Sequence, residues 1–226
     1  VNGDKKAEVI VGAGPGGLPQ VSVFSGTGML LNSFLTANPS ISDASGVING
    51  ASGVPVGTTR SNGKVAILAT ATAGSQPLVS VFDGRTMQPL ASFVPILLPG
   101  KITGGLFVAT GDVTGSGVDN IIVGTDQGPV AQVGIYNFAT QKPVSLFLPF
   151  GLFTGGVRVG TGDFNGDGFA DLVEGTGPGT ATQVRVGDGG KGAVVFEAGP
   201  FVESVTGGGG GAAAGAGGGA GRGAGG

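Results

Sequence analysis

The chain has 226 residues, among them 51 glycines and 13 prolines, and only 11% of its residues are charged, with a net charge of −3. It contains no cysteine, histidine or tryptophan, which excludes disulfides, thiol or imidazole catalysis and zinc sites built from cysteine and histidine. Its eleven lysine and arginine residues form no basic stripe, and no apolar run reaches the roughly 18 residues of a membrane helix, so neither nucleic acid nor a membrane span is expected.

Two sequence markers recur along the chain and predict an internal repeat. The first is a short apolar stretch that ends in glycine or threonine, at residues 9–12, 67–70, 121–124 and 172–175. The second is an alternating apolar stretch at residues 20–24, 78–82, 132–136 and 183–187, and its copies keep the same spacing as those of the first. A Thr-Gly-Gly marker follows near the ends of three units, at 103–105, 154–156 and 206–208. The spacing between copies changes by the same amounts for both strand markers, which indicates a repeat of four units. These are about 1–50, 51–105, 106–156 and 157–206.

The last unit shows what each repeat contains. Its apolar residues fall into four short runs separated by turn residues, at about 157–161, 172–175, 183–186 and 194–197, which is typical of strands. One four-stranded sheet cannot bury both faces alone, so neighbouring sheets have to stack. The sequence therefore predicts an all-β protein, a partial β-propeller of about four blades with four antiparallel strands each.

An acidic loop between the first two strands of the last unit is the strongest candidate site. It places Asp163, Asn165, Asp167 and Asp171 at loop positions 1, 3, 5 and 9, with a glycine at position 6. Alternate oxygens at this spacing can converge on Ca²⁺, with the backbone carbonyl of Phe169 at position 7 as a further ligand. The alternative is a hairpin turn that binds nothing, but turn chemistry does not explain the third acid, Asp171. We expect a neighbouring acid, Asp188, to lie outside the site.

The equivalent loops of the other units are poorer in charge. The third unit supplies oxygens but little charge and predicts a weaker site, at Asp112, Thr114, Ser116, Val118 and Asn120. The first unit has a truncated set, Asn2, Asp4 and Glu8. For both, a structural turn remains the alternative. In the second unit, residues 58–66 bring two cations and an alanine to the aligned positions, which argues against calcium there.

Two further motifs match local patterns without their structural context. Residues 12–17 read G-x-G-x-x-G, but a strand-like stretch follows where a dinucleotide site needs a helix, and the first acid after the motif is Asp43. Counting from Asp163, Glu174 completes an EF-hand pattern, but the flanking segments are too rich in glycine, threonine and valine for helices. Whether Glu174 adds a calcium ligand stays open.

The order of acidic loop, apolar strand with glycine, Gly-Pro-Gly turn and Gln-Val-x-Val resembles the FG-GAP (VCBS-type) repeat, the blade of integrin-α-like propellers. The resemblance covers about residues 1–206 and is strongest in the last unit. It implies Ca²⁺ bound by the loop Asp163 to Asp171. It also implies a secreted or cell-surface module that recognises a protein or glycan, usually with seven blades, so that further blades are expected outside a fragment.

Function and organisation follow as expectations. We expect a non-catalytic adhesion or recognition module, because no paired acids stand out beyond the candidate calcium loops. The alternatives are the propeller portion of a larger secreted enzyme, or a purely structural repeat. The stretch 207–226 is glycine and alanine with one arginine and predicts a disordered tail. If the natural state is a ring of seven blades, residues 1–206 alone should self-associate through exposed sheet edges or be only marginally stable.

Overall fold

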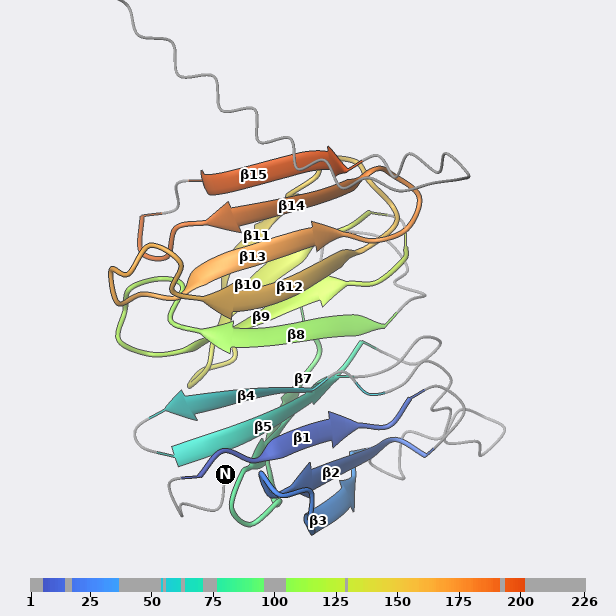
Figure 1. Cartoon of the computed structure of the whole chain (residues 1–226), viewed down its shortest axis with the longest axis vertical. Coiled ribbons are helices and arrows are strands. Elements are labelled where there is room, and N and C mark those ends of the chain that lie inside the picture. The colour runs from blue at the N-terminus through green and yellow to red at the C-terminus, as the bar shows by residue number, and fades with distance from the viewer. Residues whose placement is uncertain are drawn as a thin grey trace, which may run out of the picture.

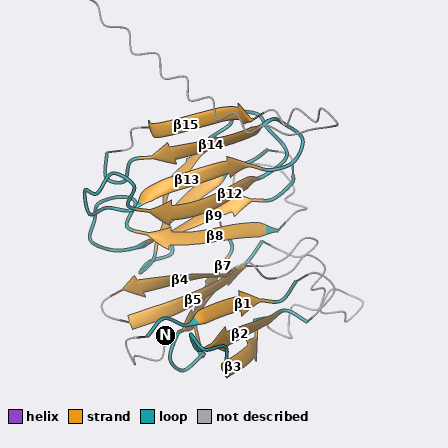
Figure 2. Ribbon diagram, viewed as in Figure 1, coloured by secondary structure: helices purple, strands orange, loops and turns teal. Residues whose placement is uncertain are grey.

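The computed structural model describes residues 6–14, 18–36, 54, 56–61, 64–70, 77–95, 105–128, 130–191 and 194–201. Every regular element in these ranges is a β-strand, and they contain no helix that could cross a membrane. Fifteen strands form four antiparallel sheets, each built from one continuous part of the chain (Figures 1 and 2). The expected all-β architecture of repeated sheets is confirmed. The tail at 207–226 lies outside the described residues.

The sheets follow one another in chain order, and each is a simple meander. The first sheet contains β1 (Val9–Gly12), β2 (Gln20–Phe24) and β3 (Leu30–Leu35). The second contains β4 (Val56–Ser61), β5 (Lys64–Thr70), β6 (Val79–Asp83) and β7 (Pro89–Phe93). The third contains β8 (Leu106–Gly111), β9 (Asn120–Thr125), β10 (Val133–Asn137) and β11 (Pro143–Phe147). The fourth contains β12 (Val157–Gly162), β13 (Asp171–Thr176), β14 (Thr182–Gly187) and β15 (Val194–Phe201).

The two strand markers of the sequence fall where the repeat predicts. The first marker forms β1, β5, β9 and β13, and the second forms β2, β6, β10 and β14. The strand expected after the G-x-G-x-x-G stretch is β2, so no helix opens there. One difference is that the first sheet has three strands among the described residues, where four were expected.

The sheets stack face to face, with β8 between β4 and β12 along the inner side of the stack (Figure 1). We call the face of a sheet that points to the following sheet its forward face, and the opposite one its backward face. Because side chains alternate along a strand, successive residues supply the two faces. Three apolar clusters fill the spaces between consecutive sheets.

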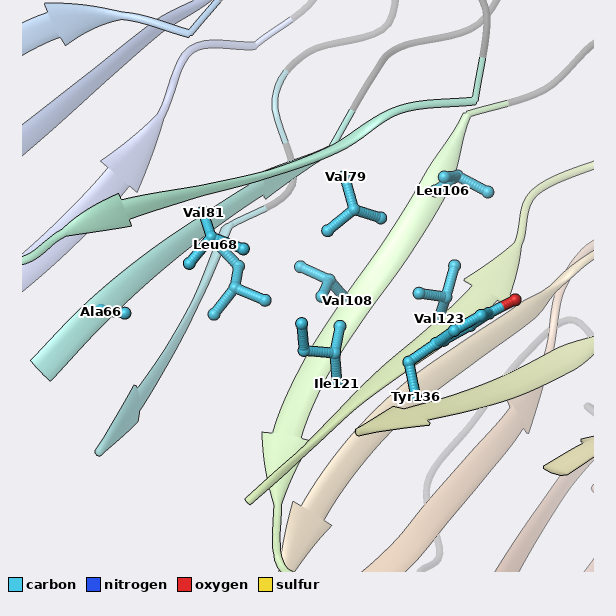
Figure 3. Packing of buried hydrophobic residues seen from close by; sticks show 9 residues of the cluster. All are labelled: Ala66, Leu68, Val79, Val81, Leu106, Val108, Ile121, Val123 and Tyr136. Carbon is cyan, nitrogen blue, oxygen red and sulfur yellow. The ribbon is translucent and has the colours of Figure 1, made fainter. Parts of the chain in front are cut away.

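The cluster between the second and third sheets shows this packing (Figure 3). Leu68, Val79 and Val81 from the forward face of the second sheet meet the backward face of the third, where Ile121 and Val123 are fully buried. Farther out, the rings of Phe93 and Tyr136 pack with centroids 5.3 Å apart. Each fully buried aliphatic side chain contributes roughly 1.5–3 kcal/mol, so these interfaces dominate stability.

Threonine side chains join the inner strands across sheets. The Thr161 hydroxyl donates to the backbone carbonyl of Thr110 at 2.6 Å, and the Thr110 hydroxyl donates to the carbonyl of Thr58. These three threonines occupy the same position in β12, β8 and β4. The polar inner strands are therefore tied to one another by hydrogen bonds as well as by packing.

Candidate metal site

Two neighbouring loops of equal length carry the principal candidate ligands. Residues 163–170 join β12 to β13, and residues 112–119 join β8 to β9, at the same end of their sheets. The loops contact each other where the Ala170 N–H donates to the Asp112 carbonyl oxygen at 3.3 Å. The turn between β14 and β15 also contacts the third-unit loop, because the Gly190 N–H donates to the Val113 carbonyl oxygen at 3.2 Å. A substitution in one loop can therefore change the conformation of the other.

In the fourth-unit loop, the acidic side chains organise the backbone. The Asp163 carboxylate accepts the N–H groups of Gly166 and Gly168, at 2.7 and 3.0 Å. The Asn165 Oδ1 accepts the N–H of Asp167, and the Asp167 Oδ1 accepts the N–H of Phe169, both at 3.0 Å. These contacts wind the loop around its own side-chain oxygens, as the alternating spacing predicts.

Asp171 is the buried anchor of this loop. It is the first residue of β13, and its side chain is fully buried. One carboxylate oxygen accepts the Phe164 N–H at 2.8 Å, and the other accepts the Gly189 N–H at 2.9 Å. The side chain thus ties the beginning of the loop to the turn between β14 and β15.

A lysine that the sequence reasoning did not include lies against this loop. Lys191 places its ammonium 2.9 Å from an Asp167 oxygen and 3.5 Å from an Asp188 oxygen. The hydrogen bond from Lys191 and the Phe169 N–H lower the pKa of Asp167, and the Asp167 contact in turn raises the pKa of Lys191. A cation therefore already neutralises part of the charge of the loop.

Asp188 belongs to the same cluster, which corrects our expectation that it lies apart. It shares the Lys191 ammonium with Asp167, and its Oδ1 is buried without a hydrogen-bond partner. The turn between β14 and β15 folds back onto the acidic loop through Gly189, which explains the proximity. Asp188 is thus a candidate additional ligand and not a neutral control.

The donor set fits a hard cation in type and charge. Carboxylate and amide oxygens are the ligands that Ca²⁺ takes, and a carboxylate oxygen that accepts one N–H retains capacity for another partner. In the described part of the chain, however, no three acidic side chains are gathered as a metal-binding group. To share one ion, Asp163, Asp167 and Asp171 have to draw together, and Asp167 has to exchange the lysine for it.

The third-unit loop closes on itself with hydroxyl groups. The Thr114 hydroxyl lies 3.3 Å from Asp112 Oδ1, 3.1 Å from the Ser116 hydroxyl and 3.1 Å from Asn120 Oδ1. The Ser116 hydroxyl also donates to the Val118 carbonyl oxygen at 3.2 Å. All five predicted positions of this loop are therefore linked by hydrogen bonds, in which hydroxyl protons lie among the oxygens.

The Asp112 carboxylate completes this loop as Asp163 does in the other. It accepts the N–H of Ser116 at 2.9 Å and that of Gly117 at 2.6 Å. Burial by itself would raise the pKa of Asp112, but these N–H groups and the hydroxyls of Thr114 and Ser116 outweigh it and lower the pKa.

The remaining candidate positions lie elsewhere. Asn2 and Asp4 are outside the described residues, and Glu8 is half-buried just before β1. In the second unit only residues 62–63 separate β4 from β5, so the aligned segment forms strands and no long loop.

Glu174, the last position of the EF-hand pattern, lies in the middle of β13. Its side chain is buried, 3.9 Å from the Arg185 guanidinium, and its Oε1 has no hydrogen-bond partner. Burial raises the pKa of Glu174 to about 7, and Arg185 opposes the shift. Since it pairs across the sheet with Val159 and Arg185, Glu174 belongs to the interface between sheets.

The opposite end of the sheets carries a different surface. A hollow of about 600 Å³ lies between the third and fourth sheets, lined by Gln127, Gly128, Thr154, Gly155, Pro178 and Gly179. Nearby, the Arg158 guanidinium lies 4.0 Å from the centre of the Phe107 ring and 3.4 Å from the Asp126 carboxylate. This contact joins β12 to the third sheet.

Meanders of antiparallel strands, stacked with their first strands side by side, define the architecture as that of a β-propeller. No protein-family model and no curated protein matches the sequence. Among solved structures the chain is similar to the Dos1 propeller, with 13% identity, a TM-score of 0.47, and coverage of 79% of this chain and 41% of that one. It is also similar to quinohemoprotein alcohol dehydrogenase from Comamonas testosteroni, with 14% identity, a TM-score of 0.45, and coverage of 86% and 34%. The chain thus spans less than half the length of either structure.

Proposed function

We propose that the chain is a calcium-stabilised β-propeller module of the FG-GAP type that recognises a protein or glycan ligand and performs no catalysis. The observation that supports the calcium part is the placement of Asp163, Asp167 and Asp171 along one acidic loop and strand start, with Asp188 on the turn that folds over it and the Lys191 ammonium between Asp167 and Asp188.

Calcium is the cation that this cluster favours. Asp163, Asn165, Asp167 and Asp171 supply side-chain oxygens and Phe169 a backbone carbonyl, which makes five ligand residues of the right type. A bidentate carboxylate or Asp188 would bring the set to the six to eight oxygens that calcium takes. The ion would take the place of the Lys191 ammonium at Asp167 and would engage the buried Asp188 oxygen, which has no hydrogen-bond partner. Its chemistry here is structural, since it would hold the loop against the turn between β14 and β15.

The proposed setting is outside the cell. Calcium sites of extracellular modules have dissociation constants of about 10⁻⁴–10⁻³ M, so such sites are filled only at millimolar calcium. The hollow at the opposite end of the sheets, with its uncharged lining, is the surface that we assign to ligand recognition. Its backbone, amide and hydroxyl groups suit a neutral polar partner.

The test is a calcium titration of the thermal midpoint. At ten times the dissociation constant, binding to the folded state alone adds roughly 1.4 kcal/mol. Asp167→Ala should lose most of the response because it removes a central ligand. Lys191→Met should strengthen the response because the competing ammonium is gone. Asp126→Asn, at the opposite end of the sheets, is the matched control and should respond like the parent.

Magnesium at equal concentration checks selectivity, because it demands six ligands at shorter distances and should shift the midpoint less. A parent protein that does not respond to calcium would refute the proposal. So would an Asp167→Ala variant with an undiminished response, since the loop would then be a structural turn.

A further inference from the structure

Two sheet faces pack on no other sheet within the described residues. They are the backward face of the first sheet and the forward face of the fourth. The two sheets lie at opposite ends of the stack (Figure 1), so these faces cannot meet within one copy of the chain. Both faces repeat the residue pattern of faces that are buried between the inner sheets.

The backward face of the first sheet carries apolar side chains that no other described sheet covers, beside a polar group of Gln20, Ser22 and Ser33. Val9 and Val11 are 55% and 45% exposed. At the positions equivalent to Val9, Ile67 in the second sheet and Ile121 in the third are completely buried. The row of Val9 continues through Phe24 on β2 to Leu30 on β3, which is 55% exposed. The first sheet thus presents an interface of the internal type to solvent.

The forward face of the fourth sheet has the complementary pattern. Val173, Val186 and Phe196 form one row across β13, β14 and β15. Ile122 and Ile135 occupy the first two of these positions in the third sheet and lie in the cluster that covers the fourth. Phe196 itself is 54% exposed.

A glycine that recurs near the ends of β1, β9 and β13 supports the same assignment. A Cβ on Gly12 would overlap the carbonyl oxygen of Val54, and one on Gly124 would overlap that of Val157, because the following sheet approaches closely at these points. A Cβ on Gly175, the equivalent glycine of the fourth sheet, would meet only Gln183 of its own sheet, at 3.9 Å. Among the described residues, therefore, none of another sheet fills the position that the following sheet takes at Gly12 and Gly124.

We propose that a second copy of this chain covers these faces, with the fourth sheet of one copy packed by its forward face on the backward face of the first sheet of the other. The same pairing of faces joins consecutive sheets three times within each copy, so the partner surface is already encoded in the chain. A head-to-tail contact of this kind closes when the second copy returns to the first, giving a two-fold ring of eight sheets.

The test is the molar mass of the full chain by size exclusion with light scattering, in EDTA so that calcium plays no part. The parent should have twice the mass of one chain. Val9→Glu and Phe196→Lys should each be monomeric, because each places a charge in the proposed contact. Leu152→Glu changes the large apolar residue that is most exposed among those described, in a loop outside both faces, and should remain a dimer.

Mixing the two monomeric variants distinguishes this arrangement from contacts between like faces. The fourth sheet of Val9→Glu and the first sheet of Phe196→Lys are both unaltered, so the mixture should regain the dimer mass. Val11→Glu replaces Val9→Glu if the latter unfolds before the parent in a thermal scan. A monomeric parent, a monomeric Leu152→Glu control or a mixture that stays monomeric would overturn the proposal.

Discussion

The third and fourth sheets share one backbone plan and differ in the chemistry placed on it. Both begin with a six-residue strand, continue through loops of equal length and start the next strand with a buried polar residue, Asn120 in one and Asp171 in the other. In the third sheet, threonine and serine hydroxyls form the side-chain hydrogen bonds of the loop, whereas in the fourth the loop is held by acids and a lysine. The fold therefore requires oxygens at these positions but not charge, and the charge of the fourth loop needs another explanation.

The largest expected difference concerns the buried residue at the start of the second strand. Asp171→Ala should lower the free energy of unfolding by about 4 kcal/mol, because it strands two N–H groups that hydrogen-bond to a carboxylate. Asn120→Ala should cost about 2 kcal/mol, since the Thr114 hydroxyl can turn to its other acceptors. Urea unfolding of both variants measures the difference, and equal losses would show that the two anchors are equivalent.

The next effect concerns the strand that follows each loop, where the third sheet buries Val123 and the fourth buries Glu174. With the pKa of Glu174 raised from 4.5 to about 7, the folded chain keeps a proton that the unfolded chain releases between these values. Stability should therefore increase as the pH falls from 7 to 4.5, and the ionised form above pH 7 costs on the order of 3 kcal/mol.

Glu174→Gln should remove this dependence and be more stable than the parent at pH 8, with the advantage lost towards pH 4.5. Melting temperatures between pH 4.5 and 8 provide the measurement. Glu197→Gln changes an exposed carboxylate of β15, which lies across Arg185 from Glu174; it is the control and should preserve the slope of the parent. A slope that survives in Glu174→Gln would assign the pH dependence to other groups.

A third effect tests whether the difference between the loops is transferable. Thr114→Asn, Ser116→Asp and Asn120→Asp together give the third loop the ligand set of the fourth. Without calcium the triple variant should lose roughly 2 kcal/mol, because its carboxylates repel one another and the residue at the position of Asp188 is Asn137, so no acid–lysine pair is available. Millimolar calcium should recover most of the loss in a thermal scan, and the absence of recovery would show that spacing alone does not make the site.

The smallest effect probes what the loops share. Asp112→Asn and Asp163→Asn should each cost about 1 kcal/mol, because in each loop the first carboxylate accepts two backbone N–H groups and an amide offers only one oxygen. Chemical unfolding of the two variants should give the same loss within about 0.5 kcal/mol. A clearly larger loss for Asp163→Asn would mean that its charge, and not only its geometry, stabilises the loop.

Periodicity predicted the strands well because the alternation of apolar residues is the direct cause of their burial. The segments at 121–124 and 132–136 became β9 and β10 within one residue at each end. The loop between β12 and β13 was also foreseen, because the spacing of its acids determines which backbone N–H groups they can reach.

Contacts between residues far apart in the chain could not be predicted from the sequence. Lys191 is 24 residues from Asp167 and meets it only because the turn between β14 and β15 folds over the loop. The hydrogen bonds among Thr114, Ser116 and Asp112 could not be predicted either, since the spacing of residues does not show where a hydroxyl proton points. The inner threonines carry no local signal because their acceptors belong to neighbouring sheets.

The close approach at Gly12 and Gly124 also determines how the stack curves. Small residues at the inner ends let consecutive sheets touch backbone to backbone, while farther out aromatic pairs such as Phe34 with Phe82 hold the sheets apart, with ring centroids 4.9 Å from each other. Each sheet is thus thinner at its inner edge than at its outer edge. This taper sets the angle turned per sheet, so adding a methyl group at Gly124 would flatten the curvature and increase the number of sheets needed to complete a circle.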